Sequence, residues 1–322
     1  AAADMLREKG YQVTVYDRYD RVGGLLIYGI PGFKLEKHVV QRRHKLLEDG
    51  GVTFRLNCDI GTDISFDEIR EAHDAVLVAT GVYKARDISA PGIGMGGIVP
   101  ALDYLTASNR KSLGDEVADF DSGLLNAEGR DVVVIGGGDT AMDCVRTAIR
   151  QKANSVTCLY RRDRANMPGS QREVANAEEE GVDFRWLSAP QAFLGDNHVR
   201  AVQAQKIHLG QPDATGRQVP QIIEDSSHEI PADLVIKALG FDPEDIPTMF
   251  GAPELEVSKW GTIGVDWRTM MTNLPGVFAA GDIVRGASLV VWGVRDGRDA
   301  AESIHSYIMA QSEAPRVAAA GA

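Results

Sequence analysis

The chain has 322 residues, and its 34 Lys and Arg against 46 Asp and Glu give a net charge of −12. The length predicts about two domains, and the acidic balance excludes a surface for general nucleic-acid or anionic-membrane binding, which needs a basic footprint. A composition of 44% hydrophobic and 25% charged residues also excludes disorder over most of the chain.

The cysteines and histidines give no sign of a metal or dithiol site. Cys58, Cys144 and Cys158 are widely spaced, and the sequence contains no Cys-x-x-Cys or His-x-x-x-His pattern. We therefore expect no metal site in this chain and a reducing, cytoplasmic setting. No apolar run approaches the ~18 residues that indicate a membrane span.

The first residues predict part of a nucleotide-binding fold. Residues 1–10 are typical of the second half of a helix that stops at Gly10, and 11–17 predict a buried strand that ends on Asp17. This order is the second half of a Rossmann βαβ unit, whose first strand and Gly-rich turn would stand upstream of Ala1. We therefore expect an α/β fold in a chain that is a fragment of a longer polypeptide.

Helices and strands continue to alternate over the next hundred residues. After a Gly- and Pro-rich loop over 21–34, the patterns predict a helix over 36–49, a strand over 52–57, a helix opened by the capping box of Ser65 and Glu68, and a strand over 75–80. Residues 85–97 predict a linker, and 99–108 predict a short helix.

The strongest motif is the run Gly136-Gly137-Gly138-Asp139-Thr140-Ala141, which follows a strand over 131–135 and opens a helix. It matches G-x-G-x-x-A, in which Gly136 permits the tight turn, Gly138 lets the backbone approach a pyrophosphate, and Ala141 keeps helix and strand close. The free N–H groups at the helix start favour phosphate. The motif predicts a dinucleotide site; a plain Gly-rich turn is the alternative.

Arginines follow the next strand, over 155–160, in the run Arg161-Arg162-Asp163-Arg164. An NAD site places an acid here for the ribose hydroxyls, whereas arginine accommodates a 2′-phosphate. The pattern therefore predicts NADP(H), held by Arg161 and Arg162 with Arg164 as a third candidate. A solvated charge run is the alternative.

The remaining elements close the second domain and return to a last helix. Ser170 and Glu173 open a helix that runs to Gly181, and four β-like segments then predict a meander, over 182–187, 199–209, 218–224 and 232–240. A strand over 276–282 precedes a helix over 289–310 with an apolar face of Val291, Val294, Ala301, Ile304 and Ile308. About the last ten residues should be frayed.

A second nucleotide site is predicted from separated pieces. Asp17 can accept hydrogen bonds from ribose hydroxyls, and the pair Gly23-Gly24 lets backbone run beside a ligand. Thr80-Gly81 and Gly281-Asp282 each end a strand, where phosphate or a ribityl chain could bind. Each piece alone is more often a turn than a site.

Together these pieces resemble the two-dinucleotide-binding-domain flavoproteins, in which an NAD(P)H domain interrupts an FAD domain. Four long runs are similar to the family of small (beta) subunits of NADPH-dependent glutamate synthases: DRVGGLLIYGIPGFKLEK, VIGGGDTAMDC, YRRDRANMPGSQREV and AAGDIVRGASLVVWGVRDGR. The resemblance covers nearly the whole chain. It implies two Rossmann-like domains, with 1–90 and 243–322 as the FAD domain, 91–128 as a connection and 129–242 as the NADPH domain, the first FAD βα unit being incomplete.

The resemblance implies an electron-input module in which NADPH gives a hydride to FAD. Electrons would pass through 4Fe-4S clusters, expected on a missing N-terminal region, to a large (alpha) subunit that forms glutamate from 2-oxoglutarate and glutamine. Such hydride transfer needs no catalytic side chain, and none is assigned. No nucleic-acid or membrane partner is expected. The open alternatives are the electron-input module of a dihydropyrimidine dehydrogenase-like or ferredoxin-coupled reductase, and a non-catalytic nucleotide-binding subunit.

The resemblance also implies the residues of both cofactor sites. The FAD site would comprise Asp17, Gly23, Gly24, Leu25, Thr80, Gly81, Gly281, Asp282, Ser288, Leu289 and Val290. The NADPH site would comprise Gly136, Gly138, Asp139, Thr140, Ala141, Arg161, Arg162 and Gly240. Because the first FAD loop and its strand are missing, we expect this chain to hold FAD weakly or not at all.

Overall fold

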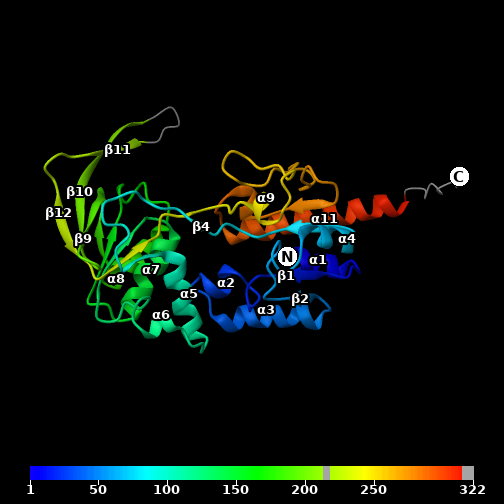
Figure 1. Cartoon of the computed structure of the whole chain (residues 1–322), viewed down its shortest axis with the longest axis horizontal. Coiled ribbons are helices and arrows are strands. Elements are labelled where there is room, and N and C mark those ends of the chain that lie inside the picture. The colour runs from blue at the N-terminus through cyan, green and yellow to red at the C-terminus, as the bar shows by residue number, and fades with distance from the viewer. Residues whose placement is uncertain (213–217, 314–322) are drawn as a thin grey trace. The chain divides into compact units, whose positions relative to one another are not determined.

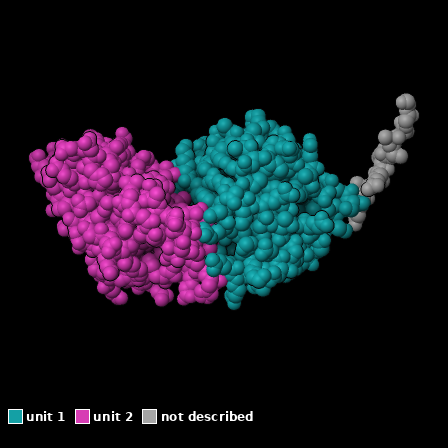
Figure 2. Space-filling model, turned by 60° about the horizontal axis from the view of Figure 1, so that its bottom comes forward, with its two compact units in different colours: residues 1–22, 40–84, 241–322 teal, residues 23–39, 85–240 magenta. Residues whose placement is uncertain are grey.

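The computed structural model describes residues 1–212 and 218–313, and the chain divides into two compact units (Figure 1). Unit 1 comprises residues 1–22, 40–84 and 241–322, and unit 2 comprises residues 23–39 and 85–240, coloured teal and magenta in Figure 2. The fraying expected for the last residues concerns positions that lie outside the described part of the chain.

Unit 2 is built on a five-stranded parallel sheet with strand order β5-β13-β6-β7-β8. Apart from one charged residue at an end of each, the central strands β6 and β13 are buried runs of β-branched and other apolar residues, as parallel sheets covered on both faces require. The strands are β5 (Ile98–Pro100), β6 (Asp131–Ile135), β7 (Ser155–Leu159), β8 (Asp183–Arg185) and β13 (Leu234–Lys237).

The helices that lie wholly within the described residues of unit 2 are α2 (Leu25–Tyr28), α5 (Ala101–Ser112), α6 (Ala118–Asp121), α7 (Asp139–Arg150) and α8 (Gln171–Glu179). Helix α7 is almost entirely buried because it packs against β6 and β7 on one side and against α5 and α8 on others. Tyr104 of α5 is fully buried in the same core, and its hydroxyl donates to Oε1 of Gln151 at 2.9 Å. The predicted strand, Gly-rich turn and helix over 131–150 are thus confirmed.

An antiparallel sheet is inserted between β8 and β13, and it corrects the predicted meander. Its strands are β9 (Ser188–Gly195), β10 (Val199–Pro212), β11 (Gln218–Ile222) and β12 (His228–Pro231), with β10 paired to the other three. The segments over 182–187 and 232–240, expected in the meander, instead form β8 and β13 of the parallel sheet. Their short apolar runs look alike in sequence, since periodicity does not separate the two kinds of strand.

Unit 1 contains two separate pairs of parallel strands: β1 (Thr14–Tyr16) with β2 (Thr53–Arg55), and β15 (Val277–Ala279) with β3 (Val76–Val78). Its helices are α1 (Ala2–Glu8), α4 (Phe66–Ala72), α9 (Ile246–Met249), α10 (Asp282–Arg285) and α11 (Val290–Glu313). Helix α3 (Lys37–Asp49) begins in residues of unit 2 and continues into unit 1. A short strand pair, β4 (Lys84–Ala85) with β14 (Phe241–Asp242), lies where the chain passes between the units.

The predicted helix starts have mixed outcomes. The capping box at α4 is confirmed, because Ser65 accepts from the Glu68 N–H and Glu68 reaches back to the Ser65 N–H. At α8 the helix is confirmed, but Ser170 forms no side-chain cap. The carboxylate of Glu173 instead accepts a hydrogen bond from Arg146 of α7.

The helix predicted over 289–310 is present as α11, and its apolar face is buried over only part of its length. Ala301 and Ile304 are buried, but Val291 and Val294 are exposed. A helix-period pattern shows which residues share a stripe and not whether that stripe is covered along its whole length. No helix in the described part of the chain combines the length and the apolar character needed to cross a membrane.

Candidate functional site

The Gly-rich turn of unit 2 follows directly after β6 and requires glycine at its first two positions. Gly136 has φ 148°, and a Cβ there would lie 2.1 Å from the carbonyl oxygen of Ala238 on the neighbouring strand end. A Cβ on Gly137 would lie 2.3 Å from the ring of Tyr160. The backbone is therefore drawn close to two other chain segments, which is the local structure the motif predicts.

The turn leads into the start of α7, where the space beside the backbone is open. Gly138 is the N-cap, and a Cβ built on it meets nothing within 4 Å. The first N–H groups of any helix lack intrahelical partners, so this 12-residue helix offers donors and a positive dipole end beside that space. Thr140 lies in the first turn of α7, and Ala141 behind it is fully buried.

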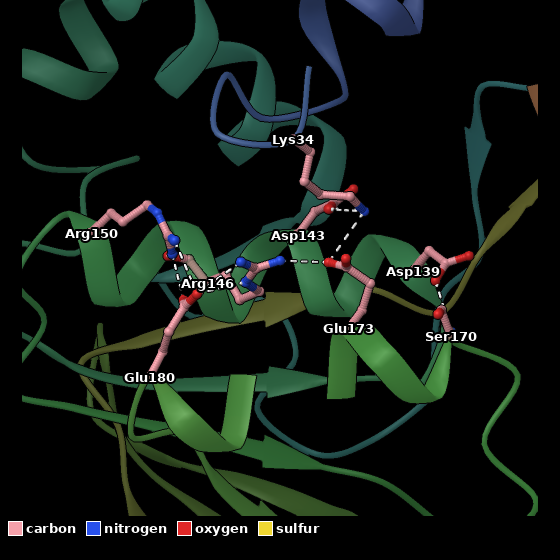
Figure 3. A network of polar contacts seen from close by, with 8 residues as sticks. All are labelled: Lys34, Asp139, Asp143, Arg146, Arg150, Ser170, Glu173 and Glu180. Carbon is pink, nitrogen blue, oxygen red and sulfur yellow. Dashed lines mark hydrogen bonds and ion pairs between the residues drawn. The ribbon is translucent and has the colours of Figure 1, made fainter. Parts of the chain in front are cut away.

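Gly169 and Ser170, just before α8, also contact this turn, and the sequence did not predict that contact. The Gly169 N–H donates to the Gly137 carbonyl at 3.0 Å, and the Ser170 N–H donates to Oδ1 of Asp139 at 3.0 Å (Figure 3). Asp139 therefore joins the start of α8 to the start of α7. The run MPGS was part of the resemblance, but no periodicity or turn rule predicts this contact.

The arginines lie beside the turn because β6 and β7 are adjacent and in register. Ile135 pairs with Leu159, and the Gly136 N–H donates to the Leu159 carbonyl at 3.2 Å. Arg161 and Arg162 follow two and three residues after Leu159, so the structure brings the turn and the arginine run to the same edge of the sheet. This is the arrangement in which a dinucleotide spans from pyrophosphate to adenosine ribose.

The three arginines of the run differ in their environments. Arg161 is exposed and has no ion pair or hydrogen bond with the described residues, so it is available for a ligand phosphate. Arg162 donates to the Gln218 carbonyl at 3.1 Å, while its buried Nε lacks a partner among the described residues. Arg164 is engaged with Glu178 at 2.7 Å. Gly240, with φ 93°, follows β13, and its carbonyl accepts from the Arg86 N–H at 3.0 Å.

In unit 1, Asp17 and Thr80 each lie just beyond a strand. Asp17 follows β1, its Oδ1 accepts from the Tyr19 N–H at 2.9 Å, and burial raises the pKa of its carboxyl. Thr80 follows β3, and its buried Oγ1 has no hydrogen-bond partner among the described residues. A buried hydroxyl without a partner is costly, so a ligand atom at this place would satisfy it. Gly81 comes next with φ 75°.

The third piece in unit 1 is the segment between β15 and α11, which contains α10. Gly281 has φ 79° with open space where a Cβ would stand. Burial raises the pKa of the Asp282 carboxyl, although the Ser288 N–H bonds to it. Leu289 and Val290 follow at 58% and 57% exposure, so apolar side chains and a carboxylate lie close together at the start of α11.

The glycine pair predicted for the FAD site belongs to unit 2. Gly23 and Gly24 have φ 125° and 50°, values that favour glycine, and Leu25 begins α2. The structure thus gathers the predicted NADPH residues within unit 2. The predicted FAD residues divide between unit 1 and this short segment.

The fold and these turns define a class: proteins with two dinucleotide-binding α/β units, one interrupting the other in sequence. The chain belongs to the pyridine nucleotide-disulphide oxidoreductase family, whose sequence pattern matches residues 1–314. Within that family it is 68% identical over 320 residues to the glutamate synthase [NADPH] small chain of Azospirillum brasilense, and 41% identical over 314 residues to that of Escherichia coli. These matches confirm the resemblance on which the sequence analysis relied.

The chain covers only part of these relatives. The Azospirillum match spans 99% of this chain and 66% of the relative, and the Escherichia match spans 96% and 66%. Among solved structures, Mycobacterium tuberculosis FprA in complex with NADPH has a TM-score of 0.80 at 18% identity, covering 97% of this chain and 82% of that one. Lactococcus lactis thioredoxin reductase has a TM-score of 0.68 at 21% identity, covering 96% and 95%. Both likenesses confirm the two-domain Rossmann-type fold.

Proposed function

We propose that this protein is the electron-input subunit of an NADPH-dependent glutamate synthase and that unit 2 is its NADPH port. The observation that carries the proposal is the Gly136–Ala141 turn with Arg161 beyond the neighbouring strand. The α7 N-terminus would hold the pyrophosphate, and Arg161 would pair with the 2′-phosphate. Arg162, anchored on β11, presents a second guanidinium at the same edge.

FAD is the second cofactor of the proposal, and residues of unit 1 fit it. Asp17 would accept from the adenosine ribose, Thr80 and Gly81 would lie near the pyrophosphate, and Gly281 and Asp282 would hold the ribityl-phosphate region. The unpartnered Oγ1 of Thr80 and the open space at Gly281 support this assignment. Ser288, Leu289 and Val290 would face the pyrimidine edge of the flavin, and Gly23, Gly24 and Leu25 would line the flavin.

When both cofactors are bound, NADPH supplies a hydride and FAD accepts it. The chain's own residues bind and orient the two nucleotides, and no side chain is required to act as acid, base or nucleophile. In the proposal, electrons would then leave through 4Fe-4S clusters towards a large (alpha) subunit that would form glutamate from 2-oxoglutarate and glutamine. The likeness to glutamate synthase small chains supports this partner.

The test is calorimetric binding of NADP⁺ and NAD⁺ to the full-length protein and to the Arg161→Ala variant. Loss of a hydrogen bond to a charged group costs about 1.5–3 kcal/mol, so NADP⁺ affinity should fall about 10- to 100-fold towards the NAD⁺ level, which should not change. Arg200→Ala is the matched control, because Arg200 is exposed and pairs only loosely with Asp196. Equal affinity for NADP⁺ and NAD⁺ in the unaltered protein would refute the NADPH port.

A further inference from the structure

Residues 23–39, here called the strap, are held on the outer side of α7 although they are about a hundred residues away in sequence. The Phe33 ring lies under two guanidinium groups of α7, 3.8 Å from Arg150 and 4.7 Å from Arg146, measured from each Cζ to the ring centroid. Beside it, Nζ of Lys34 lies 2.7 Å from Oδ1 of Asp143 (Figure 3). The strap is thus held on α7 by cation–π contacts and by an ion pair. The ion pair between Lys34 and Asp143 is here called the clasp.

The clasp is part of a larger network that reaches α8. Lys34 also lies 3.6 Å from Glu173, which accepts from Arg146 at 2.6 Å (Figure 3). Glu180 accepts from Arg146 at 2.8 Å and pairs with Arg150. The side chains of Lys34 and Asp143 are only 24% and 10% exposed, so their pairing is shielded from water far more than a surface pair.

The strap is fixed at its other points as well. The ammonium of Lys37 donates to the carbonyl oxygens of Leu26 and Ile30, closing the strap on itself. The buried Asn109 amide on α5 donates to the Tyr28 carbonyl at 2.8 Å. The strap is therefore anchored on two helices of unit 2, α5 and α7, and the clasp is the anchor nearest the Gly-rich turn.

We infer that Lys34 and Asp143 are positioning residues for the hydride transfer, because the clasp fixes Gly23, Gly24 and Leu25 to the helix that receives the NADPH pyrophosphate. The inference rests on the proposed function, since it assigns the strap's glycines to the flavin. It adds that one rigid element carries both the flavin-lining segment and the NADPH-binding helix start, so that loss of the clasp misplaces one cofactor against the other. A misplacement of about 1 Å can cost on the order of 100-fold in rate.

An ion pair suits this role better than an apolar contact. Asp143 is faced by Lys34 and Lys37 from the strap, by Glu173 from α8 and by Asp139 from its own helix. Among these groups, the buried carboxylate of Asp143 forms its ion pair with Lys34. The strap can therefore bind to α7 in one position only. Phe33 alone would tolerate sliding along the two arginines.

The test uses the FAD-loaded full-length protein and the double variant Lys34→Met with Asp143→Asn, which removes both charges and leaves none buried and unpaired. Hydrogen exchange should quicken about 10-fold or more in peptides from residues 23–39. Reduction of the flavin at saturating NADPH, followed by stopped-flow absorbance, should slow about 10-fold or more, while the Kd for NADP⁺ should stay within about 2-fold. The variant Lys34→Arg should keep the wild-type values, since it keeps the pair.

Lys45→Met is the control, because Lys45 lies on α3 beyond the strap and forms an exposed pair with Asp49 of the same helix. Unchanged exchange of the strap in the double variant would overturn the clasp itself. Faster exchange together with an unchanged rate of flavin reduction would overturn its positioning role. Absence of NADP⁺ binding to the unaltered protein would instead refute the proposed function, so the two failures are distinguishable.

Discussion

Asp139 and Asp143 lie one turn apart on α7, but their carboxylates have different surroundings and different roles. Asp139 stands in the first turn of α7 and accepts the Ser170 N–H. Asp143 is buried against Lys34, and burial raises the pKa of its carboxyl to about 6 despite the ammonium beside it. Desolvation thus outweighs the attraction of a partner at 2.7 Å, because the Asp143 side chain is only 10% exposed, and the neighbouring carboxylates of Glu173 and Asp139 add to the rise.

This raised pKa predicts a pH dependence of stability with a definite sign. Between the unfolded value of 3.8 and about 6, the folded chain holds a proton on Asp143 that the unfolded chain has released. The free energy of unfolding should therefore fall as the pH rises through this window, by up to about 3 kcal/mol for a shift of about two pKa units. Urea unfolding of wild type and Asp143→Asn at pH 4–7 checks this.

The variant lacks the titrating group, so the unfolding free energy of wild type minus that of the variant should decrease from pH 4 to pH 6 and then stay level. Asp131→Asn serves as the comparison, because Asp131 lies in the same unit, half-buried at the start of β6, and its carboxylate accepts from the Ser155 hydroxyl rather than from a lysine. A difference that increases with pH over this window would contradict the account of Asp143.

At the scale of elements, α7 and α8 are joined by ions of opposite charge rather than by apolar contact alone. Glu180, just beyond α8, accepts from both Arg146 and Arg150. The hydrogen bond from Arg150, with that from Arg146, lowers the pKa of the Glu180 carboxyl to about 2. The carboxyl is 23% exposed, so water screens the pair only in part.

Glu180→Gln should lower the free energy of unfolding by about 1–3 kcal/mol at pH 7, since the charged hydrogen bonds from two arginines lose their acceptor charge. The contribution of Glu180 is fully present above its unfolded pKa of 4.5 and is lost as the pH falls towards 2. The stability difference from wild type, measured by urea unfolding, should therefore shrink below pH 4.5. Glu179→Gln, the exposed neighbour without an ion pair in the described chain, should change little; an equal loss there would show that helix charge alone is responsible.

The elements also show which parts of the fold and of the candidate site can be predicted from the sequence. The turn at 136–141 and the arginines after β7 were predictable, because each depends on residues adjacent in sequence and on the register of neighbouring strands. The clasp was not, because Lys34 and Asp143 are 109 residues apart and each is ordinary in its local pattern. The failed cap at Ser170 has the same origin: Glu173 bonds to a distant arginine, and tertiary contact overrides local pattern.

At the scale of the whole molecule, the chain passes between the two compact units more than once, and the strap is counted with unit 2 although unit 1 flanks it in sequence. The resemblance assigns residues 129–242 to NADPH, residues 1–90 and 243–322 to FAD and residues 91–128 to a connection, and this division is a prediction. The two assignments predict different effects of each cofactor, because a ligand stabilises the part of a protein that binds it and leaves an independent part unaffected.

Hydrogen exchange read by mass spectrometry tests this division directly. NADP⁺ at about 100 times its Kd should raise the free energy of local opening in the binding unit by at most about 2.7 kcal/mol. Protection should rise in peptides covering the Gly136–Ala141 turn and residues 155–162, and peptides from 1–22 and 241–313 should exchange as before. In Arg161→Ala the protection at the same NADP⁺ concentration should weaken in parallel with affinity. Protection confined to the peptides of unit 1 would reverse the cofactor assignment and place NADP⁺ where the resemblance places FAD.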